Sequence, residues 1–138
     1  MKFKKLFGIA VLALVVFSGI KGYGPLGGDT GGDGDPVIAS AYKNHQSGVP
    51  VTGEGVVVKV LPDDNTGSRH QKFILKLSSG QTLVIAHNID LAPRIPSLRS
   101  GDQVAFRGVY EWNSEGGVIH WTHDDPSGRH AAGWVKRR

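Results

Sequence analysis

The chain has 138 residues, 39% of them hydrophobic and 8% aromatic, which is enough for one small domain but not for two. It has no cysteine, which excludes disulfides, thiol catalysis and lipid attachment through an N-terminal cysteine. The formal charge of +4 comes mostly from the N-terminus, because three basic and no acidic residues lie in the first 18 positions. The rest of the chain has 13 basic and 12 acidic residues, a net charge of +1. This near-neutral charge excludes a general argument for nucleic-acid binding.

The N-terminal segment 1–21 has the pattern of an export signal. Lys2, Lys4 and Lys5 precede an uncharged, mostly apolar run at 6–20, and cleavage is expected after Ser18. The run is short for a transmembrane helix, so no stable membrane insertion is expected if it is cleaved. We expect an exported protein, periplasmic or extracellular, with an uncleaved anchor in the inner membrane as the alternative.

A Gly- and Asp-rich segment at 22–35 predicts a solvated linker, and the domain itself is expected at 36–138. Asp35 is a suitable helix cap with Pro36 at the first helical position. Val37, Ile38, Ala41 and Tyr42 then fall on one face, before a Ser-Gly pair at 47–48. One short helix is therefore expected outside the main core.

The remaining sequence has the period of β-strands. Alternating or β-branched patterns predict five strands, at 55–61, 72–77, 81–86, 103–112 and 118–122. The long connection between the third and fourth strands contains Pro93 and Pro96, which disfavour a helix there. Together with 20 glycines, this pattern predicts an all-β fold: a small five-stranded OB-like Greek-key barrel.

On that topology, three connections are expected to meet at one pole of the barrel. They bring together several polar and aromatic residues, namely Asp63, Asp64, Arg69, His70, His87, Asp90, Trp112 and Asn113, with His120 near the start of the fifth strand. Arg69 and His70, helped by Lys72, are the preferred phosphate contacts, and a solvated loop tip is the alternative. Trp112 borders a loop where a base or sugar could stack.

The stretch 116–134, GGVIHWTHDDPSGRHAAGW, concentrates three histidines, two aspartates, an arginine and two tryptophans. His123 and Asp125 are two residues apart and could ligate a divalent metal, with His130 or His87 completing the set. His120 and His123 are three apart, so on a regular strand they face opposite ways and share an ion only if the chain bends near Thr122.

Other readings of this stretch stay open. The sequence DDPSG at 124–128 is also a good turn. Arg129 either clamps an anion or pairs with Asp124 or Asp125. The chain from His123 onward is expected to leave the barrel at the pole opposite His87. Residues 124–134 should then fold back along the barrel, anchored by Trp134, and carry Arg129 and His130 toward His120 and His87.

Four strings closely resemble one bacterial family, and they are VLPDDNTGSRHQKFIL, LVIAHNIDLAPRIPSL, GDQVAFRGVYEWN and GGVIHWTHDDPSGRHAAGW. The family is domain of unknown function 3465, and the likeness covers residues 55–135. It implies an exported barrel-like domain and implies no activity. The segment at Ile89 and Asp90 is also similar to staphylococcal nuclease, but the third strand lacks that enzyme's arginine and no glutamate follows shortly, so the likeness does not carry nuclease activity over.

Two functions follow as hypotheses. The first is binding of an anionic ligand, such as an oligonucleotide, phosphate or acidic glycan, through Arg69, His70, Lys72, His87, Trp112, His120 and Arg129. The alternative is a metal-assisted phosphodiesterase. A divalent ion would activate a water as nucleophile, because no side-chain nucleophile is evident, and it would be held by some of His87, His120, His123, Asp124, Asp125 and His130.

Overall fold

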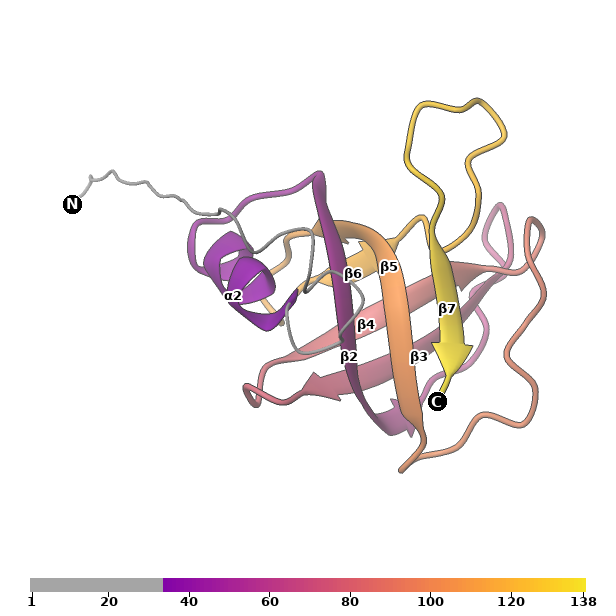
Figure 1. The fold of residues 1–138 in the computed structure, drawn as a ribbon. Helices are drawn as coiled ribbons and strands as arrows, with labels where there is room; N and C mark the ends of the chain where they lie inside the picture. The colour runs from indigo at the N-terminus through magenta and orange to yellow at the C-terminus, as the bar shows by residue number, and fades with distance from the viewer. Residues whose placement is uncertain (1–33) are drawn as a thin grey trace.

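The computed structural model describes residues 34–138, so the predicted export signal at 1–21 and nearly all of the predicted linker lie outside it. The described part is a closed five-stranded barrel with one added strand and one short helix (Figure 1). The elements are α2 (Asp35–Lys43), β2 (Val49–Val60), β3 (His70–Leu77), β4 (Thr82–Asn88), β5 (Gln103–Glu111), β6 (Val118–His120) and β7 (Trp134–Arg137). The predicted OB-like barrel is confirmed.

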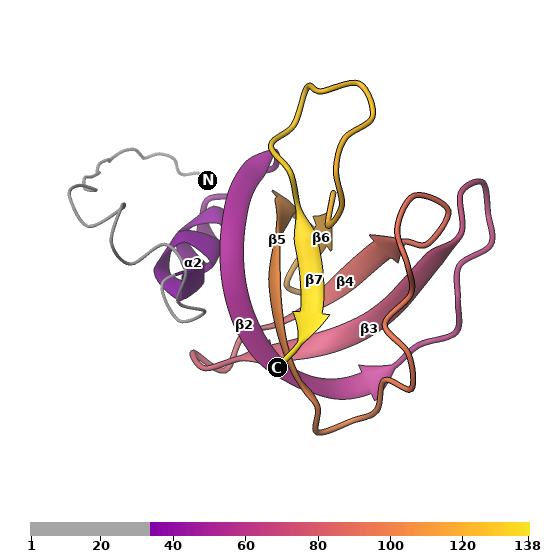
Figure 2. The same cartoon turned by 45° about the vertical axis from the view of Figure 1, so that its right-hand side comes forward.

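Strand order explains the closure. The order is β2-β3-β4-β6-β5, and a further pairing of β2 with β5 closes the ring. β6 runs parallel to β4 and antiparallel to β5, while the other pairs are antiparallel. β7 pairs with β5 over Val104 to Arg107. It lies on the same side of β5 as β6, which is too short to cover this part of the strand. Figure 2 shows β7 lying along β5.

The first strand is longer than predicted. β2 begins at Val49, six residues before the expected start, and it pairs with β5 through its first half and with β3 through its second. The prediction missed this half because Pro50 and Gly53 are typical of loops. Here the glycines allow close packing: a Cβ at Gly53 would lie 2.7 Å from the Phe106 ring, and one at Gly55 would lie 2.5 Å from the Lys76 carbonyl oxygen.

The barrel interior is filled by large apolar side chains from every strand of the ring. Tyr110, Phe73, Phe106, Ile85 and Ile119 are among the fully buried ones. Burying each such side chain contributes on the order of 1.5–3 kcal/mol relative to exposure. The Tyr110 hydroxyl donates a hydrogen bond of 2.8 Å to the Gly116 carbonyl, which satisfies the one polar atom of that ring.

Helix α2 packs against β2, and its buried residues Ile38 and Ala41 belong to the hydrophobic core, so the prediction of a helix outside the main core is wrong. Asp35 does not cap it as predicted, because the capping position is Gly34 and no side-chain cap bond forms. Its carboxylate instead accepts hydrogen bonds from the Ser78 hydroxyl and from the Ser79 backbone N–H, at 3.2 Å for the latter. Asp35 therefore joins the helix to the β3–β4 turn.

The connection between β4 and β5 contains no helix, as the prolines predicted. Its middle is fixed by one buried side chain. Gln71 donates through Nε2 to the Ile95 carbonyl at 3.0 Å and accepts from the Ile95 N–H at 2.9 Å. This pair of bonds substitutes for a strand partner and holds the connection against the barrel.

The fifth barrel strand ends two residues earlier than predicted. Trp121 has a φ of 60°, and this left-handed conformation ends β6 at His120. Residues 121–133 then form a loop that extends away from the barrel (Figure 1), closed where the Gly133 N–H donates to the His123 carbonyl at 3.1 Å. The prediction that residues 124–134 fold back along the barrel with Trp134 as anchor is wrong, because the chain returns only at β7, where Val135 packs against the core and Trp134 is half-buried.

No helix within residues 34–138 is both long enough and apolar enough to cross a membrane.

Candidate functional site

The end of the barrel where β3 starts and β4 and β6 finish contains most of the predicted site. His70 pairs with Asn88 across the two strands, which brings Arg69 beside Asp90. His120, the last residue of β6, lies one position beyond Ile119, whose partner on β4 is Ile85. The grouping of His70, His87, His120 and Arg69 at one end therefore agrees with the prediction.

Trp112 and Asn113 lie at the other end, so their predicted place in this group is wrong. Because β6 runs parallel to β4, the loop before β6 lies beside the start of β4, where the Gln81 side chain donates to the Gly116 carbonyl at 3.1 Å. The Trp112 indole donates to the Tyr42 carbonyl at 3.0 Å and stacks on His45 with ring centroids 4.1 Å apart. Trp112 is thus a contact between barrel and helix.

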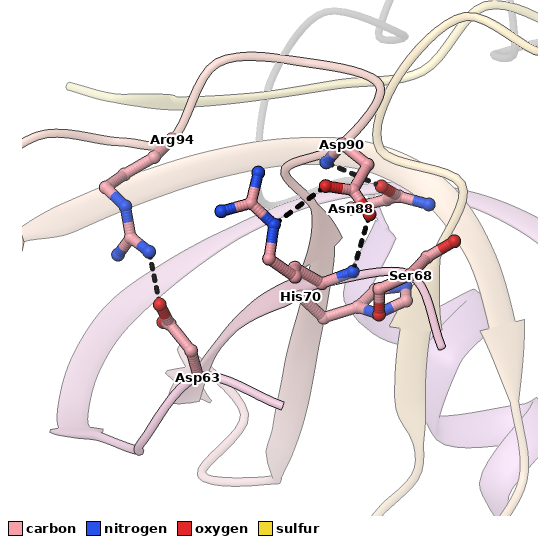
Figure 3. Close-up of polar contacts among 7 residues, drawn as sticks. Asp63, Ser68, His70, Asn88, Asp90 and Arg94 are labelled. Carbon is pink, nitrogen blue, oxygen red and sulfur yellow. Dashed lines mark hydrogen bonds and ion pairs between the residues drawn. The ribbon is translucent and has the colours of Figure 1, made fainter. Parts of the chain in front are cut away.

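Two of the predicted phosphate contacts, Arg69 and Lys72, have carboxylate partners, and Figure 3 shows the ion pair at Asp90. Arg69 donates from Nε to Asp90 at 2.8 Å and from its backbone N–H to the same carboxylate at 2.9 Å. These bonds lower the pKa of Asp90. Arg94 pairs with Asp63 in the same way, so the local charge is largely balanced.

Lys72 lies 4.0 Å from Asp64. The backbone N–H of Thr66 holds the pKa of Asp64 below its usual value, so this carboxylate is charged at neutral pH. An incoming phosphate would therefore have to compete with a carboxylate at Lys72 as well as at Arg69.

His87 is placed inside the barrel wall and is only 3% exposed. Its Nε2 lies 2.9 Å from the Pro93 carbonyl oxygen, which only accepts, so Nε2 carries the hydrogen. In the neutral ring Nδ1 then accepts the Thr122 hydroxyl at 2.7 Å. Burial lowers the pKa of His87, and both nitrogens are occupied, so this residue serves the fold rather than a ligand.

Three other histidines share one open depression, the histidine hollow, of about 400 Å³. It is lined by His70, His120 and His123, together with Glu111 and Asn88. His70 and His120 approach edge to face, with ring centroids 6.5 Å apart. His123 was expected to leave from the opposite pole, and the bend at Trp121 keeps it at this one.

The metal site predicted at His123, Asp125 and His130 does not form. Among residues 34–138 no three histidine, aspartate or glutamate side chains stand close enough to hold an ion. The Asp125 carboxylate accepts instead from the backbone N–H groups of Ser127, Arg129 and His130 at 2.8–3.0 Å. Desolvation acts to raise its pKa, but these bonds outweigh it and lower the pKa to about 2.

Arg129 and His130 reach a second depression, of about 140 Å³, on the outer face of β5. The His130 ring stacks on Trp121 with centroids 4.2 Å apart, and Arg107 lines the same depression. The Arg129 side chain bonds to Ser127 through Nε at 3.1 Å and forms no ion pair with Asp124 or Asp125, although its backbone N–H donates to Asp125. The expected approach of Arg129 and His130 to His87 is wrong, because the 121–133 loop bends outward.

Two further residues beside this depression were missed by the sequence analysis. Arg107 pairs across the strands with Trp134, and the Lys136 ammonium lies 4.8 Å from the centre of the Trp134 ring. Residues directly opposite on antiparallel strands share a face, so Arg107 connects the two tryptophans. The available signal was an exposed arginine within the otherwise apolar strand at 103–111.

A third and larger depression, about 590 Å³, separates β7 from the connection at 91–96. Trp134 and Lys136 form one side of it, and Arg94 and Arg137 also line it. Both arginines have acidic partners, Asp63 and Asp102. Lys136 is thus the cation of this depression with no carboxylate partner within the described chain.

Fold and surface together define a small OB-like barrel with a basic, tryptophan-containing outer face. A family model described as "Protein of unknown function (DUF3465)" matches residues 30–138, and the chain belongs to this family. No curated protein matches the sequence.

Proposed function

We propose that the protein binds a single-stranded oligonucleotide on its outer face. The binding surface is the basic–aromatic surface, defined as Arg107, Trp121, Arg129, His130, Trp134 and Lys136. What supports this most is one observation: unpaired cations flank two half-buried tryptophans, and no acidic residue lines the depression between Arg107 and Arg129.

The cations of this surface differ from those at the end of the barrel where the sequence predicted the ligand. Five basic residues carry ion pairs, and they are Arg69, Lys72, Arg94, Arg137 and Arg138. Within 34–138, Arg107, Arg129 and Lys136 have no such partner. A phosphate can therefore contact them without displacing a carboxylate, which makes them better anion ligands than Arg69.

The tryptophans supply the second requirement for binding single strands. Stacking of a base on an aromatic side chain contributes about 1–3 kcal/mol and is insensitive to sequence. Trp121 lines the same depression as Arg107. Trp134 lies opposite Arg107 where β7 pairs with β5. A chain of alternating bases and phosphates fits this alternation of indole, guanidinium and indole.

Two more considerations favour the same class of ligand. Barrels of this topology bind oligonucleotides and oligosaccharides, and this fold analogy supports the class of ligand rather than the position of the surface. The near-neutral charge means that binding must come from the local surface and should weaken steeply with salt. The export signal predicted at 1–21 would place this activity outside the cytoplasm, and N-terminal sequencing of the mature protein tests that placement.

The binding assay uses a labelled single-stranded oligonucleotide of about 12 nucleotides, within the range bound by one such barrel. Fluorescence anisotropy should show salt-sensitive binding that Trp134→Leu weakens. Arg129→Ala should also weaken it, while Arg99→Ala, which changes an exposed arginine at the 97–102 turn, should not. A sulfated glycan that binds more tightly than the oligonucleotide, or no salt-sensitive binding at all, would refute the proposal.

A further inference from the structure

The histidine hollow contains imidazole nitrogens that the fold does not use. We infer that His70, His120 and His123 bind a divalent transition-metal ion there. None of these residues belongs to the basic–aromatic surface, so this inference stands independently of oligonucleotide binding.

Hydrogen bonds fix the tautomers of two of the rings. His70 Nδ1 lies 2.9 Å from the Ser68 carbonyl oxygen, and His123 Nδ1 lies 2.7 Å from the Asp124 carbonyl oxygen. Because a carbonyl only accepts, each Nδ1 carries the hydrogen, and in the neutral ring Nε2 keeps its lone pair. Metal-binding histidines show this arrangement, in which a backbone carbonyl orients the ring and the other nitrogen ligates.

The Nε2 atoms of these two rings have no hydrogen-bond partner in the described chain. His123 is the more telling case, because it is 6% exposed and still lines the hollow. Its Nε2 is not among the buried unsatisfied atoms of the described chain, so this nitrogen is accessible and free to receive a ligand.

The backbone conformation that creates this group is itself strained. On a regular strand His120 and His123 would face opposite sides of the sheet. Trp121 takes a φ of 60°, a conformation that is strained for a bulky residue, and this bend turns His123 into the same hollow as His120. Strain that persists in a fold is often kept where it positions functional groups.

The histidine side chains must move to close the site. The described part of the chain holds no ready-made three-ligand group, and the His70 and His120 centroids are 6.5 Å apart. Two rings that share one tetrahedral ion at about 2.0–2.1 Å per nitrogen have centroids roughly 5 Å apart. The His70 and His120 side chains are only partly buried, which leaves them room to rotate.

The donor set selects the kind of ion. Imidazole nitrogens with a nearby carboxylate, here Glu111, suit zinc, copper and nickel, whereas calcium and magnesium prefer oxygen ligands. The sequence has no cysteine, so no thiolate competes for the ion. We expect copper(II) to bind more tightly than zinc, following the general affinity order.

Isothermal titration of the untagged protein with zinc chloride tests the inference. We expect one ion per chain, and a dissociation constant raised by more than about tenfold in both His70→Ala and His120→Ala, since even outer-shell changes cost 10–100-fold. The matched control is His45→Ala, an exposed histidine at the other end of the barrel. Arg107→Ala should leave zinc binding unchanged, which separates this site from the oligonucleotide surface.

A second readout guards against variants that fold poorly. Long-range ¹H–¹⁵N spectra of the unaltered protein report each histidine nitrogen, and zinc should shift Nε2 of His70 and His123 while their Nδ1 atoms stay protonated. Magnesium at the same concentration should shift neither. The inference is overturned if zinc does not bind, if binding survives both substitutions, or if zinc shifts His45 or His130 instead.

Discussion

The imidazole of His87 and the hydroxyl of Thr122 form a hydrogen bond of 2.7 Å inside the barrel wall. The other ring nitrogen donates to the Pro93 carbonyl at 2.9 Å. His87 therefore joins the end of β4, the start of the β4–β5 connection and the bend after β6. These are the segments that surround the histidine hollow.

This relationship predicts a stability that falls in mild acid. Burial lowers the pKa of His87, and burial also lowers that of His120, so the unfolded chain binds more protons than the folded one as the pH drops below about 6.5. Stability is thus fully present above pH 6.5 and is lost as the pH falls toward the folded pKa values. Urea unfolding between pH 7.5 and pH 5 measures this.

The variant His87→Gln separates the two contributions. At pH 7.5 it should be less stable by about 1–3 kcal/mol, because a buried polar group loses a partner. Its decline between pH 7.5 and pH 5 should be shallower than that of the unaltered protein. An equal decline in both proteins would mean that His87 is not the residue that titrates.

A second prediction concerns the bonds between Gln71 and Ile95. Gln71→Leu keeps an apolar body in the buried position but leaves the Ile95 N–H and carbonyl without partners. The cost should be about 1–3 kcal/mol, measured by urea unfolding. Gln103→Leu is the control, because Gln103 is an exposed residue on β5, and its effect should stay within about 0.5 kcal/mol.

The third prediction concerns the 121–133 loop. Asp125 accepts the backbone N–H groups of Arg129 and His130, so Asp125→Ala should release both side chains from their places on the basic–aromatic surface. Oligonucleotide affinity should fall severalfold while the melting temperature changes little, because the loop is exposed and contributes little to the core. A large drop in melting temperature with unchanged affinity would show that the loop is a structural element instead.

The barrel could be predicted because its signals are local. Alternation in the strands and the two prolines before β5 indicate secondary structure directly, and five strands with one long connection fit few topologies. The first half of β2 was missed because Pro50 and Gly53 are typical of loops, and the predicted strand starts only at Gly55. The role of the two glycines depends on Phe106 and Lys76, which approach only after the strand has curled.

The site could be predicted only in part, for a related reason. Arg69 is neutralised by Asp90, which lies 21 residues away in the sequence. Trp112 faces the helix because β6 pairs in parallel with β4. The bend that the sequence analysis required for His120 and His123 to meet does occur, at Trp121. Nothing in the sequence marks Trp121 as left-handed, since that conformation is usual for glycine and uncommon for a bulky residue.

The salt dependence of oligonucleotide binding in Arg107→Ala and Arg69→Ala tests the central claim most directly. For single strands, the logarithm of the affinity falls with the logarithm of the salt concentration by about 0.7 per phosphate contact. We predict that Arg107→Ala weakens binding and reduces this slope by about one contact, while Arg69→Ala, which removes a cation already paired with Asp90, changes neither. A slope that falls for Arg69→Ala and stays unchanged for Arg107→Ala would contradict the account and return the ligand to the end of the barrel first predicted from the sequence.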